Sequence, residues 1–494
     1  MKLKPALLSK FIASCVFLFA YWSPAADAPV LPEITRETIV HASLFDRIAE
    51  LNRVQEPELD LATMRTEFTR LMEMARPAVS AAATPRAKIA ALNKVLLADR
   101  NVAYLSNKYW RDSTLAASLL RGKGNCLSTS TLYVLAGAAL DLPIHMVVVP
   151  RHAFARWDDG QTRFNIETTN KGMEIPDSEY FSRWSSADPQ DIDALGWGQS
   201  LDDNGVYTEL LRAAAYHRIG ENKLEEAIAL IEQAKKFQPR RSDLALWRCE
   251  VMADMTGRRD EACAKVKEML REPEQKLPPS VETGAYEYLA HDAAGKGDHA
   301  MERVYLLVAF SRAPKSSQLQ VLTSLAFCLR ALKDFHGAVR YMELAAVMEP
   351  QNDALLYNLA ILQKNDGRLD QALSTIQDAR KINPESWNLQ ILEAGYRVLN
   401  GEREEGMKLF DTLERPRGDV EFFEIMLAWF YAASAQREMF FKQFEHALSA
   451  SRNTQIFEWI DQDPDLDIYR KEEDFKMLVE KHRKRLLKEQ ADAK

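Results

Sequence analysis

Small residues recur every 34 positions through much of the second half of this 494-residue chain. Two such series, twelve residues apart, are Ala326, Ala360, Ala394 and Ala338, Ala372, Gly406. Pro350 and Pro384 keep the same interval and close successive units. A helix, a turn and a second helix in each unit predict an array in which every helical pair buries its apolar face on the next pair. The chain beyond residue 201 is therefore predicted to be all-α.

The period of 34 resembles that of tetratricopeptide repeats. We expect about seven units between Val206 and Arg452, the third and seventh being irregular, wound into a superhelix. The resemblance implies a protein or peptide ligand in the concave groove of that superhelix. Some large aromatic side chains are expected mostly in the core, with a minority in the groove: Tyr216, Trp247, Tyr288, Tyr357 and Trp429.

A second feature is a cysteine at the predicted start of a helix. Apolar and small residues repeat at helical spacing from Leu127 to Ala139, and Asn125 is a good N-cap. Cys126 then occupies the first helical position, where unpaired backbone N–H groups and the helix dipole favour a thiolate. Gly122 and Gly124 leave the preceding loop free to approach a substrate closely.

A β-hairpin is predicted next, after the apolar strand IHMVVV at 144–149. Asp159-Gly160 suits a two-residue type I′ turn, and that register places His152 directly opposite Glu167. It also places Arg156 opposite Arg163. One face of the hairpin is predicted to be apolar and packed, while the face that carries His152 and Glu167 is predicted to be polar and available.

A thiol, an imidazole and a carboxylate are the groups of a thiol enzyme. We predict Cys126 as nucleophile, His152 as general base and acid, and Glu167 as the residue that orients the ring. Asn165 is the alternative orienting residue, and His145 is expected to be a packed or surface histidine. The alternative for Cys126 is a small buried hydrophobic residue.

The segments GNCLSTSTLY, PRHAFARW and FNIETT resemble the transglutaminase-like superfamily, which has a papain-like Cys-His-Asp fold. The likeness covers roughly residues 85–180 and favours the bacterial branch that is joined to tetratricopeptide repeats. It implies an α+β domain with Cys126, His152 and Glu167 as the triad, Glu167 standing where the family usually has Asp. Several branches have lost the cysteine and only bind.

The N-terminus predicts export. Residues 1–28 combine three lysines, an apolar run from Phe11 to Trp22 and small residues near a cleavage site at Ala25–Ala28, so we expect a secreted, periplasmic bacterial protein. The run is too short to span a bilayer, and no later segment is predicted to be transmembrane. The net charge is −8, and removal of three lysines and one aspartate makes it −10. An acidic chain without a basic stripe is a poor partner for nucleic acid.

The cysteines that follow the predicted signal peptide and the acidic run near the C-terminus do not predict a metal site, and we expect no cofactor. Cys126, Cys249, Cys263 and Cys328 are too few for a disulfide scaffold and lack zinc spacing, although a Cys249–Cys263 bridge is an alternative. The acidic run from Asp461 to Glu472 is close to an EF-hand pattern, but Leu466 stands where the loop needs glycine. We interpret this run as turn and N-cap chemistry.

These observations divide the chain into a signal peptide (1–28), a transglutaminase-like domain with a helical lead-in (29–200), a repeat array (201–456) and a capping segment (457–494). The predicted function is thiol-dependent acyl transfer, as amidase, peptidase or transglutaminase, on a protein or peptide recruited by the repeats. The alternative is a catalytically silent envelope scaffold. Lead-in helices are predicted from residues at helical spacing: Leu44, Ile48, Leu51 and Leu61, Met64, Phe68, Leu71.

Overall fold

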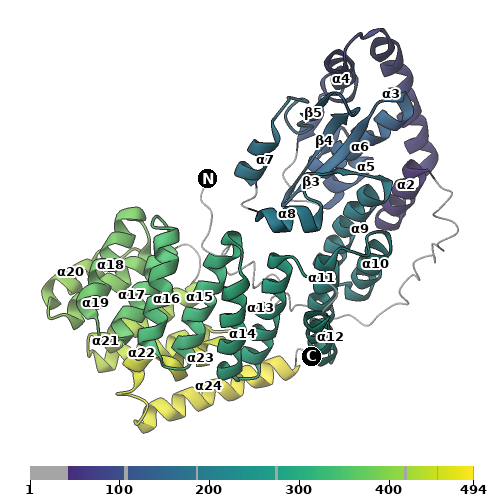
Figure 1. Cartoon of the computed structure of the whole chain (residues 1–494). Coiled ribbons are helices and arrows are strands. Elements are labelled where there is room, and N and C mark those ends of the chain that lie inside the picture. The colour runs from purple at the N-terminus through teal and green to yellow at the C-terminus, as the bar shows by residue number, and fades with distance from the viewer. Residues whose placement is uncertain are drawn as a thin grey trace. The chain divides into compact units, whose positions relative to one another are not determined.

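The computed structural model describes residues 43–104, 110–184, 187–272, 276–416, 420–452 and 454–492 (Figure 1). The predicted signal peptide lies outside the described residues. Contacts divide the chain into two compact units. The N-terminal unit holds the described residues up to Leu289 with Ser311–Ser317, and the C-terminal unit holds Ala290–Phe310 with the described residues from Gln318 onward.

The N-terminal unit begins with a mixture of helices and short strands. Its elements before the helical pairs are α2 (Leu44–Gln55), α3 (Leu61–Ala81), α4 (Pro85–Asn93), η3 (Lys94–Ala98), β1 (Ala103–Tyr104), η4 (Trp110–Ser113), α5 (Leu115–Leu120), β2 (Lys123–Gly124), α6 (Cys126–Leu140), β3 (Ile144–Val149), β4 (His152–Asp158), β5 (Arg163–Ile166), α7 (Asp177–Trp184), α8 (Pro189–Leu195) and β6 (Ser200–Leu201).

The lead-in helices form as the spacing predicts. Ser43 caps α2, and the Asp60 side chain caps α3 by accepting from the N–H groups of Ala62 and Thr63. The residues that the pattern assigned to the core are buried at Leu44, Ile48, Leu51, Met64 and Leu71. Leu61 and Phe68 are less buried.

Helix α6 starts and ends where the sequence predicts. Asn125 is its N-cap, and Asp141 ends it in the left-handed conformation with φ of 55°. The two glycines before the helix have different roles. Gly122 has φ of +59°, whereas a Cβ on Gly124 would lie 2.6 Å from Ser128 Oγ. Gly124 therefore allows close packing against α6 itself, and not the approach to a substrate that we expected.

A four-stranded antiparallel sheet with the order β5-β4-β3-β6 packs beside α6 (Figure 1). β1 and β2 form a separate parallel pair. Val147, Val149 and Phe154 of the sheet pack against Ile175 and Tyr180 from the region of α7. The opposite face meets α6, since a Cβ on Gly137 would lie 2.8 Å from Ile144 Cβ.

The predicted hairpin register is wrong by two residues. Arg156 pairs with Asn165 and Asp158 pairs with Arg163, so the loop has four residues, 159–162, instead of two. The side chain of Asp159 causes this, because its Oδ1 accepts from the N–H groups of Gln161 (2.9 Å) and Thr162 (2.6 Å). Arg156 is therefore not opposite Arg163 as predicted, and Arg163 forms an ion pair with Asp158.

The expectation of an available polar face is also wrong. A shift of two residues keeps every side chain on its predicted face, but Phe154, Arg156, Asn165 and Glu167 are all buried. Tyr180 of α7 packs on this face. The sheet is therefore covered on both sides, and its polar groups bind one another.

Fourteen of the described helices, α9 to α22, follow one another along the chain. They are α9 (Asp203–Gly220), α10 (Leu224–Phe237), α11 (Ser242–Ala253), α12 (Arg259–Arg271), α13 (Pro279–Gly295), α14 (His299–Arg312), α15 (Lys315–Ala331), α16 (Phe335–Met348), α17 (Asp353–Asn365), α18 (Leu369–Ile382), α19 (Trp387–Leu399), α20 (Arg403–Asp411), α21 (Val420–Ala433) and α22 (Arg437–Ala450). The predicted fold class, an α+β region followed by helical repeats, is confirmed.

Close packing explains the 34-residue series of small residues. Every member is buried. A Cβ on Gly406 of α20 would lie 2.6 Å from the backbone oxygen of Ala394 of α19. Each small side chain lets the two helices of a pair approach, and larger residues around these positions form the core.

The tail contains α23 (Gln455–Gln462), η5 (Pro464–Leu466) and α24 (Glu473–Asp492). Its apolar residues, among them Ile456, Ile460 and Leu466, share one core with Phe440 and Phe444 of α22. In the acidic run, Asp463 caps η5 and Asp465 accepts from Trp429 Nε1 at 2.8 Å. The prediction of turn and N-cap chemistry is thus confirmed for this run.

No helix in the described ranges combines the length and the apolar character that crossing a membrane requires.

Gly137→Ala tests the contact between α6 and β3. The new methyl group would meet Ile144 at 2.8 Å, so we expect the free energy of unfolding to fall by about 1–3 kcal/mol despite the better helix propensity of alanine. Gly220→Ala, at the end of α9 with nothing within 4 Å, should raise it by about 0.5 kcal/mol. Chemical denaturation measures both, and equal effects of the two changes would contradict the packing argument.

Candidate active site

Cys126 is the first residue of α6, behind a complete capping box. Asn125 Oδ1 accepts from the N–H groups of Leu127 (3.0 Å) and Ser128 (3.1 Å), and Ser128 Oγ accepts from Asn125 N–H at 3.0 Å. Asn125 Nδ2 donates to Ser113 Oγ at 2.6 Å. These bonds fix the first turn, and hence the direction in which the thiol leaves the helix. Cys126 is 6% exposed.

His152 lies between the thiol and a carboxylate. Its Nε2 is 2.8 Å from Glu167 Oε2, and both residues are buried. Its ring also makes a hydrogen bond with the side chain of Cys126. Because Nε2 is bound to Glu167, Nδ1 is the nitrogen that remains for the sulfur. The structure therefore brings together all three residues that the sequence proposes as a triad.

Thr168 joins the cysteine helix to the segment that carries the carboxylate. Its Oγ1 is 2.8 Å from Thr129 Oγ1 and 3.1 Å from Ser130 Oγ, both on α6. Thr168 directly follows Glu167, so these bonds fix the distance between the start of α6 and the end of β5. The serine and threonine residues of GNCLSTST thus have a positional role.

Glu167 is hydrogen-bonded at both carboxylate oxygens. Oε1 accepts from Thr169 N–H at 2.9 Å and from the Thr169 hydroxyl. Oε2 accepts from Tyr180 OH at 3.0 Å in addition to its bond with His152. Burial acts to raise the pKa of Glu167, but the bonds from His152 and Thr169 outweigh burial and lower it. The buried carboxyl is consequently ionised.

The charge on His152 follows from the same balance. Burial acts to lower its pKa, but hydrogen bonds and charges from Cys126 and Glu167 outweigh burial and raise the pKa to about 9. An imidazolium between a sulfur and a carboxylate is the arrangement that stabilises a thiolate and supplies a proton to a leaving group.

Asn165, the alternative orienting residue, has other partners. Its Oδ1 accepts from Arg156 Nε at 2.7 Å, and its Nδ2 donates to Ile175 O and Asp177 Oδ1. Arg156, 1% exposed, also donates to Gly198 O and pairs with Asp177. The amide therefore belongs to a network that fixes the start of α7.

The other residues that the sequence singled out lie apart from this cluster. His145 pairs with Arg156 in the register of β3 and β4 and is partly exposed. Cys249, Cys263 and Cys328 are buried, and the structure does not have the alternative Cys249–Cys263 disulfide. Within the described residues, no group of histidine, cysteine and acidic side chains has the geometry of a metal site.

Three residues near the site were missed by sequence reasoning. Thr169 lies in FNIETT and was recognisable as a donor to its neighbour. Tyr180 lies on a short helix thirteen residues after Glu167, and nothing local signals its contact. Tyr104, half exposed on β1, lies near enough to Cys126 and Glu167 for their charges to add to burial in raising its pKa.

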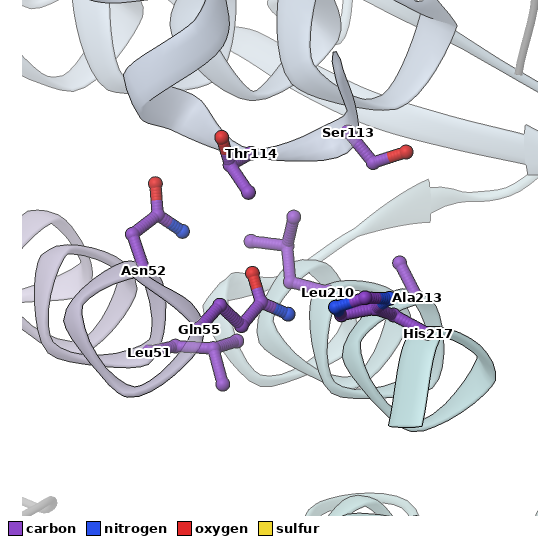
Figure 2. Close-up of a pocket in the computed structure, with 8 residues that line it drawn as sticks. All are labelled: Leu51, Asn52, Gln55, Ser113, Thr114, Leu210, Ala213 and His217. Carbon is purple, nitrogen blue, oxygen red and sulfur yellow. The ribbon is translucent and has the colours of Figure 1, made fainter. Parts of the chain in front are cut away.

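A small pocket adjoins the helix cap. Figure 2 shows it between α2, the start of α5 and α9, where polar groups of Asn52, Gln55, Thr114 and His217 surround it. Ser113 also lines this pocket and accepts from Asn125 Nδ2. The wall of the pocket and the cap of the cysteine helix therefore share one hydroxyl group.

Family models match two regions of this chain. The family described as the transglutaminase-like superfamily matches residues 62–214, and the tetratricopeptide repeat family matches residues 329–415. This chain joins a transglutaminase-like domain to tetratricopeptide repeats. The transglutaminase-like match includes all three triad candidates and extends into α9.

Several solved structures match part of this chain at low identity. A tetratricopeptide repeat protein from Parabacteroides merdae is 15% identical, with a TM-score of 0.38 over 51% of this chain and 97% of its own. PilW, described as a type IV pilus biogenesis factor, is 15% identical, with a TM-score of 0.33 over 41% of this chain and 90% of its own. YrrB is 14% identical, with a TM-score of 0.25 over 41% and 82%. No curated protein matches the chain.

The pKa of His152 gives the transglutaminase-like domain a defined pH dependence. The folded pKa is raised from 6.5 to about 9, so the stabilisation is complete below pH 6.5 and is lost as the pH rises through 9. We expect the free energy of unfolding to fall over this window by on the order of 2 kcal/mol more in the wild type than in His152→Gln. Urea denaturation at closely spaced pH values measures this difference. Parallel curves for the two proteins would contradict the charge balance.

Proposed function

We propose that the transglutaminase-like domain is a cysteine-dependent acyl-transfer enzyme that acts on amide bonds of proteins or peptides. One observation carries the proposal: a single imidazole is hydrogen-bonded to the thiol of Cys126 and to the buried carboxylate of Glu167. Its pKa of about 9 keeps the ring protonated at neutral pH, which favours the thiolate form of the nucleophile.

The reaction follows from these positions. The Cys126 thiolate attacks the amide carbonyl carbon, and the imidazolium of His152 gives its proton to the departing nitrogen. The carbon–nitrogen bond breaks, and a thioester on Cys126 remains. Water or an amine then loses a proton to His152 and attacks the thioester, which releases an acid or a new amide and restores the thiolate.

The helix start supplies a donor for the developing oxyanion. Asn125 takes up the N–H groups of Leu127, Ser128 and Thr129 through its side chain and backbone oxygens. We propose that the N–H of Cys126, at the same helix start, donates to the oxygen of a substrate carbonyl. A backbone donor at a helix N-terminus stabilises negative charge that forms beside the nucleophile.

The repeats supply the means of recruiting a substrate. Within the N-terminal unit, Tyr216 of α9 is 68% exposed and stacks on Trp247 of α11, with ring centroids 6.5 Å apart. Exposed aromatic pairs suit apolar or aromatic side chains of a peptide. We propose that the first two helical pairs use this surface to hold a protein or peptide near the thiol.

Alkylation of the free thiols tests the proposed chemistry. Cys126 and Cys249 are 6% and 4% exposed, so access to them is matched, but burial raises the pKa of Cys249 and also raises the pKa of Cys328 to about 12. We expect iodoacetamide at pH 7 to modify Cys126 at least tenfold faster than either, because only Cys126 is paired with an imidazolium. Peptide mass spectrometry after timed quenching measures the rates.

Two variants complete this experiment. His152→Gln should bring Cys126 to the rate of the other thiols, while Cys126→Ser should leave Cys249 and Cys328 unchanged. A wild-type Cys126 that reacts no faster than Cys249 would contradict the enzyme and favour a scaffold that binds through its repeats alone.

We also propose that the chain is exported to the periplasm. The basic start, the twelve-residue apolar run and the small residues that follow support this location. Expression of the full chain in a Gram-negative host should give a periplasmic protein whose N-terminus lies close to Ala28. N-terminal sequencing of the fractionated protein checks this prediction, and an intact Met1 in the cytoplasmic fraction would contradict it.

A further inference from the structure

We propose that Tyr180 is a positioning residue that holds Glu167 against His152, and that the glutamate in this triad depends on this tyrosine for its full effect. The inference rests on the proposed function, in which the three residues act together. Tyr180 lies on α7, which is outside the three sequence segments that carry the family resemblance.

Tyr180 binds the carboxylate oxygen of Glu167 that also contacts His152. Its hydroxyl donates to Glu167 Oε2 at 3.0 Å, and this is the same oxygen that lies 2.8 Å from His152 Nε2. Thr169 binds the other oxygen. A glutamate side chain has one more rotatable bond than aspartate, so its carboxylate needs more fixed donors to stay in one orientation.

The tyrosine ring also fixes the plane of the histidine ring. Tyr180 is fully buried and stacks on Phe154 with centroids 3.7 Å apart and planes 11° apart. His152 stacks on the same tyrosine at 5.8 Å and 21°. Burial, with the charge of Glu167, raises the pKa of Tyr180 far above its ordinary value, so the phenol remains a donor throughout the working range.

A buried arginine determines where Tyr180 lies. Arg156 Nη2 is 2.5 Å from Asp177 Oδ1 at the first turn of α7, and Asn165 Nδ2 donates to the same oxygen at 2.7 Å. Arg156 and Asn165 occupy paired positions on β4 and β5. The strands that carry the triad therefore also anchor the helix that supports it. Asn165 acts on the site through α7, and not on the histidine ring.

The experiment follows the pH dependence of Cys126 alkylation in the full chain. Tyr180→Phe keeps the stacked ring and removes only the donor to Glu167. We expect its alkylation rate at pH 7 to fall about tenfold, the cost of losing a hydrogen bond to a charged group, and the pH dependence of the rate to change. Tyr133→Phe is the matched control, since Tyr133 is equally buried and donates to Asn93 Oδ1 at 2.7 Å. It should leave rate and profile unchanged.

A double variant separates positioning from a general loss of structure. If Tyr180 acts through Glu167, Tyr180→Phe should have no further effect in a Glu167→Gln background. Glu167→Asp should also slow alkylation about tenfold, because the shorter arm cannot reach His152 and its other donors together.

Each result bears on one proposal. A Tyr180→Phe protein that behaves like Tyr133→Phe, or effects of Tyr180→Phe and Glu167→Gln that multiply, would overturn the role of Tyr180 while leaving the proposed enzyme intact. A wild-type Cys126 that is no faster than Cys249 overturns the proposed function itself, whatever the variants do.

Discussion

The buried hydrogen bond between His152 and Glu167 is the interaction on which the packing around the site in the transglutaminase-like domain depends. Removing an ion from water costs several kcal/mol even after relaxation, and leaving one buried partner alone costs about 3–5 kcal/mol. The domain meets this cost with donors on every side of the carboxylate: Thr169, Tyr180 and the imidazole. Loss of any one of these donors would therefore destabilise the buried pair. The packing of α7 on the sheet is therefore part of the site, because α7 supplies the Tyr180 donor and helps to bury the carboxylate.

Close approach of backbone segments fixes the position of Cys126, as the donors around Glu167 fix the carboxylate. Gly124 packs against Ser128 and Thr129, and Gly137 packs against Ile144, so α6 lies tightly on the strands along its length. Capping by Asn125 and the hydroxyl contacts of Thr168 fix the first turn. The sulfur of Cys126 thus has little freedom, and a fixed orientation before reaction is what the proposed role of Cys126 as a nucleophile requires.

The sequence was sufficient for features that depend on local spacing. The start and end of α6, the strand at 144–149 and the helical pairs all follow from caps, apolar periodicity and the 34-residue interval, and the structure confirms them. The hairpin register failed because two aspartate side chains compete with the backbone for the turn N–H groups, which an Asp-Gly signal alone does not reveal. The faces were still assigned correctly, since the error was an even number of residues. The contact of Tyr180 with Glu167 could not be predicted from the sequence, because it depends on how α7 folds back over the sheet.

Hydrogen bonds join the transglutaminase-like domain to the first helical pairs, and the composition of the sequence does not reveal them. Helix α9 begins the helical pairs, yet Arg47 of α2 donates to Asn204 Oδ1 and Asp203 O at 3.0 Å, and Arg218 donates to Val54 O at 2.9 Å. The guanidinium of Arg47 also lies over the Tyr207 ring. Further along, Asp191 of α8 accepts from Ser280 N–H at the start of α13 at 3.0 Å. The first repeats are therefore built into the same compact unit as the thiol. A peptide held on Tyr216 and Trp247 would have a fixed relation to Cys126, because α9, which carries Tyr216, is bonded to the lead-in helix that packs in the same unit as the cysteine helix.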